Sequence, residues 1–324
     1  MVDFLPGQSA RIRILDIETG ESVTVFESST LFVEAPNLSP DGRWLVVNAD
    51  GGLWRLPLGA RADGAAGADS RATLERIPLG TTPALNNDHV ISPDGRTFLV
   101  TARDGHLYEL PFDGLAEGES PRRITTPHPT DARFKFYLHG VSPDGAAIAA
   151  IGGGLNDAAT WVTNVYLVPV DAHSAPVAVT NDDFPDDGAE FAPDGRTLWF
   201  NSERAAAGID GHSQLFRLSL PILPILGAAA AEPGVPEQVT FDDRVNWFPH
   251  PSPDARHVLY LSYPAGTLGH PANRDVELRL IDLATGSVRI LTALFGGQGT
   301  INVPCWSPDS RRVAYVDYPL GTPA

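Results

Sequence analysis

The sequence contains very little lysine and a single cysteine. Lys135 is the only lysine, and 40 acidic residues outnumber 23 basic ones, which gives a formal net charge of -17. Nucleic acids and anionic membranes are bound through concentrated Lys and Arg, so this balance disfavours both as partners. Cys305 stands alone, so an internal disulfide is excluded.

Long apolar runs are also missing. No stretch of about 18 apolar residues occurs that could cross a membrane as a helix. The opening segment Met1 to Pro6 has neither the basic nor the apolar part of a signal peptide. We therefore expect a soluble, cytoplasmic protein that does not insert into a membrane. The 31 Gly and 29 Pro among 324 residues indicate a globular chain rich in turns and strands.

One four-residue pattern recurs six times. Pro at its second position presets φ, Asp bonds to nearby backbone and Gly closes the turn without steric cost, which together predict a type I β-turn. The copies are Ser39-Pro-Asp-Gly42, Ser92-Pro-Asp-Gly95, Ser142-Pro-Asp-Gly145, Ala192-Pro-Asp-Gly195, Ser252-Pro-Asp-Ala255 and Ser307-Pro-Asp-Ser310.

Each turn is followed by a β-rich run, and a third run and a weaker fourth follow in the internal copies, so each full repeat predicts a four-stranded antiparallel blade. The segment Arg11 to Gly20 reads as a third and fourth strand, whereas Cys305 to Tyr318 reads as a first and second. Together they complete one blade and leave no free sheet edge at the seam. The sequence predicts an all-β, six-bladed β-propeller over residues 1–324 as one domain, its last blade closed by the N-terminal and C-terminal strands.

The six copies differ most just upstream of the turn, where the chain crosses to the innermost strand of the next blade. These segments occupy equivalent places in the ring, so they converge on one mouth of the central channel. A single Asn or Asp there is commonly a turn former, but turn chemistry alone does not require histidines and carboxylates at one opening. We therefore predict a ligand site from Glu34, Asn37, Asn86, Asn87, Asp88, His89, Tyr137, His139, Asp186, Asp187, Glu190, Asn246, Trp247, His250 and Asn302.

Two kinds of chemistry suit this set. Tyr137 and Trp247 could stack on a sugar ring, and the acid–base candidates are Glu34, Asp187, Glu190 and His139. Alternatively, His89, His139 and His250 would suit a divalent metal ion, although no HxH or HxxxH spacing supports that geometry. The prediction is a small polar ligand, a carbohydrate, with a metal-assisted lyase or hydrolase as the catalytic option. The alternative is a non-catalytic scaffold that takes a protein partner.

Three other features of the sequence have structural interpretations. Gly296-Gly-Gln-Gly299 lacks the Lys-Ser/Thr of a phosphate loop and is interpreted as a crossover turn. The segment Gly266 to Asp275, with His270, is interpreted as an insertion between a second and a third strand. Cys305, between Pro304 and Trp306, is expected to be buried and inert.

With its repeats laid out, the chain resembles the TolB-like propellers, whose repeat carries the Ser-Pro-Asp-Gly turn. The most specific strings are Asn246 to Asp254, Gly269 to Asn273 and Phe295 to Asn302. The resemblance implies the propeller fold but not the envelope role of TolB, which has an additional N-terminal domain. Oligogalacturonate lyases are similar in repeat and hold a metal at the mouth through His and Gln, a ligand pattern that this sequence does not match residue by residue.

Overall fold

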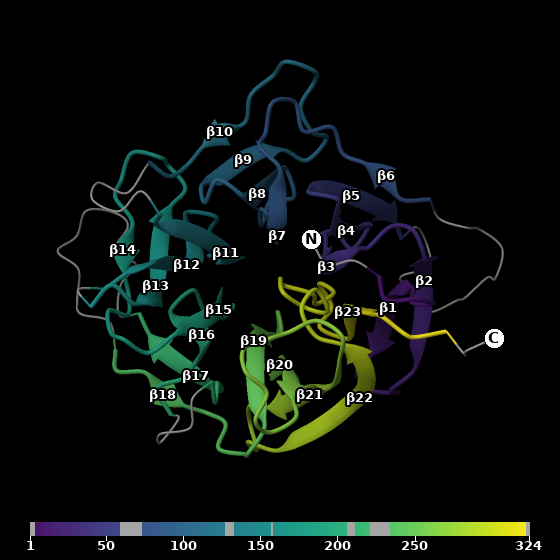
Figure 1. The fold of residues 1–324 in the computed structure, drawn as a ribbon, viewed down its shortest axis with the longest axis vertical. Helices are drawn as coiled ribbons and strands as arrows, with labels where there is room; N and C mark the ends of the chain where they lie inside the picture. Colours follow the sequence, from purple (N-terminus) through teal and green to yellow (C-terminus); the bar gives the residue numbers. More distant parts are fainter. Residues whose placement is uncertain are drawn as a thin grey trace.

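The computed structural model describes residues 4–58, 73–126, 133–156, 158–205, 211–220 and 234–321. These residues form a ring of six antiparallel sheets around a central channel, as Figure 1 shows, and the two chain ends meet in one of the sheets. The predicted six-bladed β-propeller, closed by strands from both ends of the chain, is confirmed.

Five blades have four strands, ordered from the channel outward. The first two blades are β3 (Glu34–Leu38), β4 (Trp44–Ala49), β5 (Gly52–Pro57) and β6 (Glu75–Arg76), then β7 (Leu85–Ile91), β8 (Thr97–Ala102), β9 (Leu107–Pro111) and β10 (Arg122–Arg123). The next two are β11 (Lys135–Val141), β12 (Ala147–Leu155), β13 (Trp161–Pro169) and β14 (Val177–Ala178), then β15 (Asp186–Phe191), β16 (Thr197–Ser202), β17 (Gln214–Ser219) and β18 (Glu237–Gln238). The fifth is β19 (Val245–Pro251), β20 (His257–Tyr263), β21 (Arg274–Asp282) and β22 (Val288–Gly296).

The sixth blade is the seam. β23 (Arg312–Asp317) pairs with β1 (Ala10–Asp16), which pairs with β2 (Ser22–Ser28). Its innermost strand is reduced to one bridge, between Trp306 and Val313. Arg11 reinforces the seam by donating two hydrogen bonds to Asp317, at 2.9 and 2.6 Å.

The recurring Ser-Pro-Asp motif is a structural turn. In its first copy the Ser39 hydroxyl donates to Asp41 Oδ1 at 2.6 Å and accepts from the Trp44 N–H at 2.9 Å. The copy at Ala192 has no hydroxyl there, and Thr197 Oγ1 bonds to Asp194 instead, at 2.8 Å. Hydrogen bonds to the ionised form hold the pKa of these turn aspartates below its usual range.

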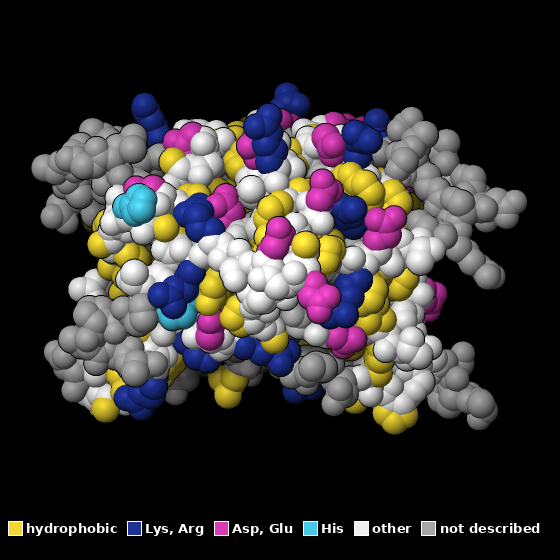
Figure 2. All heavy atoms as spheres, turned by 90° about the horizontal axis from the view of Figure 1, so that it is seen from above, with side chains coloured by type: hydrophobic (Ala, Val, Ile, Leu, Met, Phe, Trp, Pro, Cys, Tyr) yellow, Lys and Arg dark blue, Asp and Glu magenta, His cyan; other side chains and the backbone are white. Residues whose placement is uncertain are grey.

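Apolar clusters fill the spaces between neighbouring blades. One cluster joins Val46 and Leu53 of the first blade to Ile91, Phe98 and Val100 of the second. Burial of such inter-blade surface fixes the inner strands around the channel. The outer side of the ring, seen edge-on in Figure 2, mixes basic and acidic side chains with small apolar patches. Within the described residues, no helix is long and apolar enough to cross a membrane.

Candidate functional site

The inner strands carry the predicted site residues at the ends where they begin. Five of these strands contain a β-bulge there, with register shifts at Glu34/Asn37, Leu85/His89, Leu138/Gly140, Asp187/Glu190 and Trp247/His250. A bulge leaves residues unpaired and re-aims their side chains. The predicted site residues therefore lie mainly within strands. The bulges of these strands, and not turns, direct their side chains toward the mouth.

Side chains of the neighbouring blades hold the bulges in place. The Phe248 N–H donates to Asn201 Oδ1 at 3.1 Å, and the Leu138 N–H donates to Thr101 Oγ1 at 2.9 Å. Phe248 adopts a left-handed backbone conformation with φ of 54°, which is unfavourable for a bulky residue. This backbone strain occurs next to Trp247 and the rings around it.

An ion pair between the third and fourth blades forms the floor of the mouth. His139 Nε2 lies 2.8 Å from Asp187 Oδ1, and its Nδ1 lies 3.2 Å from the carbonyl oxygen of Asn302. Burial opposes the charge on His139, but the carboxylate of Asp187 outweighs it and raises the pKa to about 9. Burial also opposes the charge on Asp187, but the charge of His139 and its hydrogen bond outweigh burial. They hold the pKa of Asp187 well below its usual range. At neutral pH this is an imidazolium–carboxylate pair.

A second buried pair joins the fourth and fifth blades. His250 Nδ1 is 2.6 Å from Glu190 Oε2, and His250 Nε2 is bonded to the carbonyl oxygen of Ile301. Burial raises the pKa of Glu190 despite the neighbouring imidazole. Cys305 is fully buried and free, and burial raises the pKa of its thiol, which agrees with the expected inert cysteine.

Two carboxyl groups from the first and second blades retain protons unusually well. Burial, followed by the charge of Asp88, raises the pKa of Glu34 to about 7. Burial raises the pKa of Asp88 to about 6. Asn87 Nδ2 approaches Glu34 at 3.5 Å and Asn86 Nδ2 donates to Asp88. Both carboxyls thus change protonation near neutral pH, as general acids and bases do.

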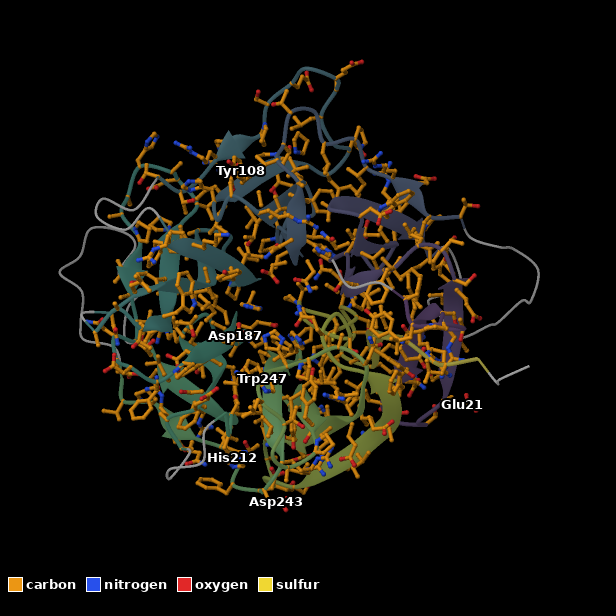
Figure 3. The ribbon with its side chains drawn as sticks, viewed as in Figure 1. Glu21, Tyr108, Asp187, His212, Asp243 and Trp247 are labelled. Atoms are coloured by element: carbon orange, nitrogen blue, oxygen red, sulfur yellow. The ribbon has the colours of Figure 1, made fainter. Side chains whose placement is uncertain are left out.

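Two buried aromatic rings of the fifth blade pack against His270. The Trp247 ring centroid lies 4.5 Å from that of His270, and Phe248 lies 5.2 Å from His270. Trp247 and Asp187 lie beside one another at the inner edges of the fourth and fifth blades (Figure 3). Burial, followed by the charges of Asp88 and Asp187, raises the pKa of Tyr137.

The structure adds two residues that the sequence reading left outside the site. His270 Nε2 lies 3.5 Å from Asp187 Oδ2, and its Nδ1 is bonded to Gln298 Oε1. His270 stands in the insertion between β20 and β21, and Gln298 stands in the crossover after β22. The sequence predicts the turn that carries Gln298 beside the mouth and the insertion that carries His270 between two strands, and both lie in strings specific to the family. It does not predict that the two side chains contact one another.

Several predicted residues have structural partners instead. Asp186 is held by Arg204 at 2.9 Å, and Asn246 accepts from Ser262 at 2.7 Å. Asn37 Nδ2 donates to the Pro304 carbonyl at 2.5 Å, and Asn302 Oδ1 accepts from Gly299 at 2.7 Å. These groups brace the ring because their polar atoms are already used by the protein.

The histidines expected to hold a metal do not form a ligand group. Among the described residues, no three His, Cys, Asp or Glu side chains are placed to coordinate one ion. Both ring nitrogens of His139 and of His250 face a carbonyl and a carboxylate, so neither offers a free lone pair. His89 is fully buried with both nitrogens unpartnered, and burial lowers its pKa to about 4. The predicted trio therefore does not fit a metal.

Comparison with known proteins assigns the family. An uncharacterized protein of Agrobacterium fabrum, Atu1656, is 36% identical over 319 residues, which are 97% of this chain and 94% of that protein. A solved structure from Agrobacterium tumefaciens that carries a provisional TolB name is 33% identical, with a TM-score of 0.77 over 98% of this chain and 99% of that one. The chain belongs to the TolB-like six-bladed β-propellers.

A more distant relative shares the fold alone. Oligogalacturonate lyase from Vibrio parahaemolyticus is 13% identical, with a TM-score of 0.52 over 94% of this chain and 77% of that one. No family model matches the chain. The resemblance drawn from the Ser-Pro-Asp-Gly repeat is confirmed at the level of the family.

Proposed function

We propose that this TolB-like propeller binds a small polar ligand, a carbohydrate, at the channel mouth, and that Glu34 and Asp88 exchange protons with it. The observation that carries the proposal is the meeting of proton-exchanging carboxyls with the contacting rings of Trp247 and His270, which are tilted by 58° to one another. Aromatic faces pack on the apolar side of a sugar, and polar groups bind its hydroxyls. Stability of the propeller and the formation of its turns do not require carboxyl groups of raised pKa beside aromatic rings.

The two carboxyls have environments that suit opposite roles. With a pKa raised to about 7, Glu34 holds a proton for part of the time at neutral pH and can donate it. Asp88, with a pKa raised to about 6, is mostly ionised and can accept one. Donation to a leaving oxygen and removal of a proton from carbon or water are the steps of a lyase or a hydrolase. The oligogalacturonate lyase of the same fold supports carbohydrate chemistry on such a scaffold.

The ion pair of His139 and Asp187 has a positioning role in this proposal. Both groups remain charged through neutral pH, so they are poor proton carriers and instead fix the strands on which the mouth is built. His270 is the half-buried imidazole at the mouth, and Gln298 fixes its ring. A ligand would meet His270 before it reached the His139 pair.

Binding and turnover test the proposal together. We expect oligosaccharides to bind the wild-type protein in calorimetry and to bind much more weakly to Trp247→Ala. New reducing ends accompanied by an unsaturated, ultraviolet-absorbing product would identify a lyase, and new reducing ends alone a hydrolase. Oligosaccharide binding without new reducing ends would indicate a carbohydrate-binding protein that is not catalytic. Equal binding by Trp247→Ala would remove the mouth as the site.

A protein-interaction scaffold is the second candidate, and exposed apolar side chains favour it. Phe241 is 76% exposed, Leu268 70% and Phe184 49%. Each lies in a connection at the end of the blades where the inner strands begin, so all three are on the face that carries the mouth. Large exposed apolar groups on one face commonly mark a protein contact. If Phe241→Ser abolished capture of a cellular protein while sugars failed to bind, this candidate would replace the first.

A further inference from the structure

A cavity lies at the end of the propeller opposite the mouth. Its volume is about 420 Å³, and it is bounded by the Ser-Pro-Asp turns of the first and second blades, with Pro40 from one turn and Gly95 from the other. Each of these turns follows the end of an inner strand, whereas the mouth lies where the inner strands begin. The cavity is therefore separate from the proposed carbohydrate site.

Two aromatic residues distinguish this junction between blades from the other junctions. Trp44 is the fifth residue after the first residue of its turn. The equivalent positions in the other five copies hold Thr97, Ala147, Thr197, His257 and Arg312. Phe112 donates its backbone N–H to the Arg96 carbonyl at 2.9 Å. The residues that make the equivalent bond in the other blades are all aliphatic: Ile17, Leu58, Val170, Leu220 and Leu283. The propeller therefore packs these two positions elsewhere without an aromatic ring, and their coincidence at one cavity indicates a ligand.

The two rings form a fixed aromatic surface in the cavity. The ring centroids of Trp44 and Phe112 lie 6.3 Å apart, with their planes at 61°, and both side chains are half-buried. The guanidinium of Arg55 lies over both rings, 4.7 Å from the Trp44 centroid and 5.7 Å from that of Phe112. It donates to Glu75 at 3.3 Å and to Asp113 at 3.1 Å, which hold it in place.

Carboxylates from both turns line the same cavity. Hydrogen bonds from the serine of each turn hold the pKa of Asp41 and of Asp94 below its usual range, so both are ionised at neutral pH. Arg43 lies 4.0 Å from Asp41, and Arg96 lies 3.9 Å from Asp94. These arginine side chains are 76% and 84% exposed, and ion pairs of such exposed groups contribute little. A basic side chain placed beside the aromatic rings would therefore meet two carboxylates.

We propose that this cavity binds a proline-rich, basic segment of a protein partner. A proline packs on the rings of Trp44 and Phe112, and an arginine or lysine side chain of the partner pairs with Asp41 or Asp94. Proline-rich segments adopt an extended polyproline II helix and bind aromatic-lined grooves at a low cost in conformational entropy. The formal net charge of -17 also favours encounter with a basic partner. An acidic segment would meet like charges from both turns.

Three nonapeptides test the proposal on the full chain. One consists of three Pro-Pro-Arg units, the second of three Pro-Pro-Glu units with the opposite charge, and the third of three Gly-Ser-Arg units with the charge but no proline. In calorimetry at low salt, we expect the Pro-Pro-Arg peptide to bind at least about tenfold more tightly than either of the others. In ¹⁵N-labelled protein it should shift the indole N–H signal of Trp44 and leave that of Trp247 unchanged.

Variants that restore the repeat locate the site. Trp44→Thr and Phe112→Leu introduce residues that other blades carry at these positions, so we expect both variants to fold, which thermal unfolding measures. Trp44→Thr should weaken binding of the Pro-Pro-Arg peptide by about tenfold or more, and Phe112→Leu and Asp94→Asn by about threefold each. Asp309→Asn is the matched control for charge, because Asp309 makes the same turn hydrogen bonds at another junction, and binding should not change.

Each opposing outcome overturns a stated part of the proposal. Equal binding of the Pro-Pro-Glu peptide would overturn the charge argument, and equal binding of the Gly-Ser-Arg peptide would overturn the recognition of proline. Full binding by both Trp44→Thr and Phe112→Leu would overturn the site. The proposal as a whole would fall if no peptide bound at millimolar concentration, or if the Trp44 signal moved with oligosaccharides and with no peptide. Calorimetry of oligosaccharides with Trp247→Ala tests the mouth separately.

Discussion

Replacing Asp187 by Asn removes the counter-ion of a buried imidazolium. The side chain keeps its size, so the change is mainly electrostatic. In the wild type, His139 lies 2.8 Å from Asp187 and its pKa is raised to about 9 from an ordinary value of 6.5. In Asp187→Asn, only the charge of Asp88 and the Asn302 carbonyl still oppose the effect of burial, so we expect the pKa of His139 to fall well below 9 and the ring to lose its proton at a lower pH than in the wild type.

The size of the effect follows from proton linkage. One pKa unit corresponds to about 1.4 kcal/mol, so a histidine raised from 6.5 to about 9 contributes about 2–3 kcal/mol to the free energy of unfolding at pH 7. The sign is that of a raised pKa: the contribution is complete below pH 6.5 and is lost as the pH rises through about 9. The stability advantage of the wild type over Asp187→Asn should therefore shrink between these values.

Urea unfolding from pH 6 to 9.5 and NMR titration of the histidine rings measure both effects. Asp243→Asn is the matched control, because Asp243 is exposed on the crossover into β19 (Figure 3) and the same substitution there should change the free energy of unfolding by less than about 0.5 kcal/mol. A wild-type His139 that titrates near pH 6.5, or a stability difference that is constant across this pH range, would refute the ion-pair reasoning.

Three further predictions concern the scaffold. Gly188→Ala should cost more than about 2 kcal/mol in thermal unfolding, because φ is +63° and the added Cβ would lie 3.0 Å from Phe248 Cα; a neutral result would contradict the tight packing of the bulge. Ala255→Gly should raise the free energy of unfolding by about 0.5–1 kcal/mol, since Ala255 has φ of 58° in its turn, and a loss would show that the strain is absent. Cys305 should resist thiol reagents at pH 8 until the protein unfolds, because burial raises its pKa; rapid labelling of the native protein would contradict this.

The fold could be predicted almost completely from the repeat. The Ser-Pro-Asp turn is a local feature, and its spacing fixed the blades and the closing of the ring by both chain ends. The reduced inner strand of the sixth blade was not foreseen. Pro304 does not distinguish this blade, because Pro36 and Pro249 stand at the same distance from the turn in the full strands β3 and β19.

The arrangement of side chains at the mouth was predicted only in part. The upstream segments did bring Glu34, Asp88, Tyr137, Asp187 and Trp247 to one mouth, because equivalent positions in a ring must converge. Which polar atoms are already bonded depends on contacts between blades, and no spacing in the sequence encodes them. Asp186 and Asn246 therefore look identical to site residues in the sequence but brace their blades in the structure.

The metal prediction failed for a related reason. Three histidines near one opening suggest a ligand group, but a ligand also needs a free nitrogen lone pair pointed at a shared centre. The carbonyl oxygens that engage His139 and His250 come from the crossover before the sixth blade, more than 50 residues away in the chain. His270 was missed because its insertion lies outside the repeat from which positions were read.

The indole N–H signals of the six tryptophans test the central claim, a ligand site at the mouth, most directly. Trp247 has an unused N–H at the mouth, Trp306 donates to the His250 carbonyl at 2.9 Å, and Trp44 lines a cavity of about 420 Å³ among the turns at the opposite end. On titration of ¹⁵N-labelled protein with glucosamine and N-acetylglucosamine, we expect the Trp247 signal to move and the Trp44 signal to stay. A shift of Trp44 alone, or no shift at saturating sugar, would contradict a ligand site at the mouth.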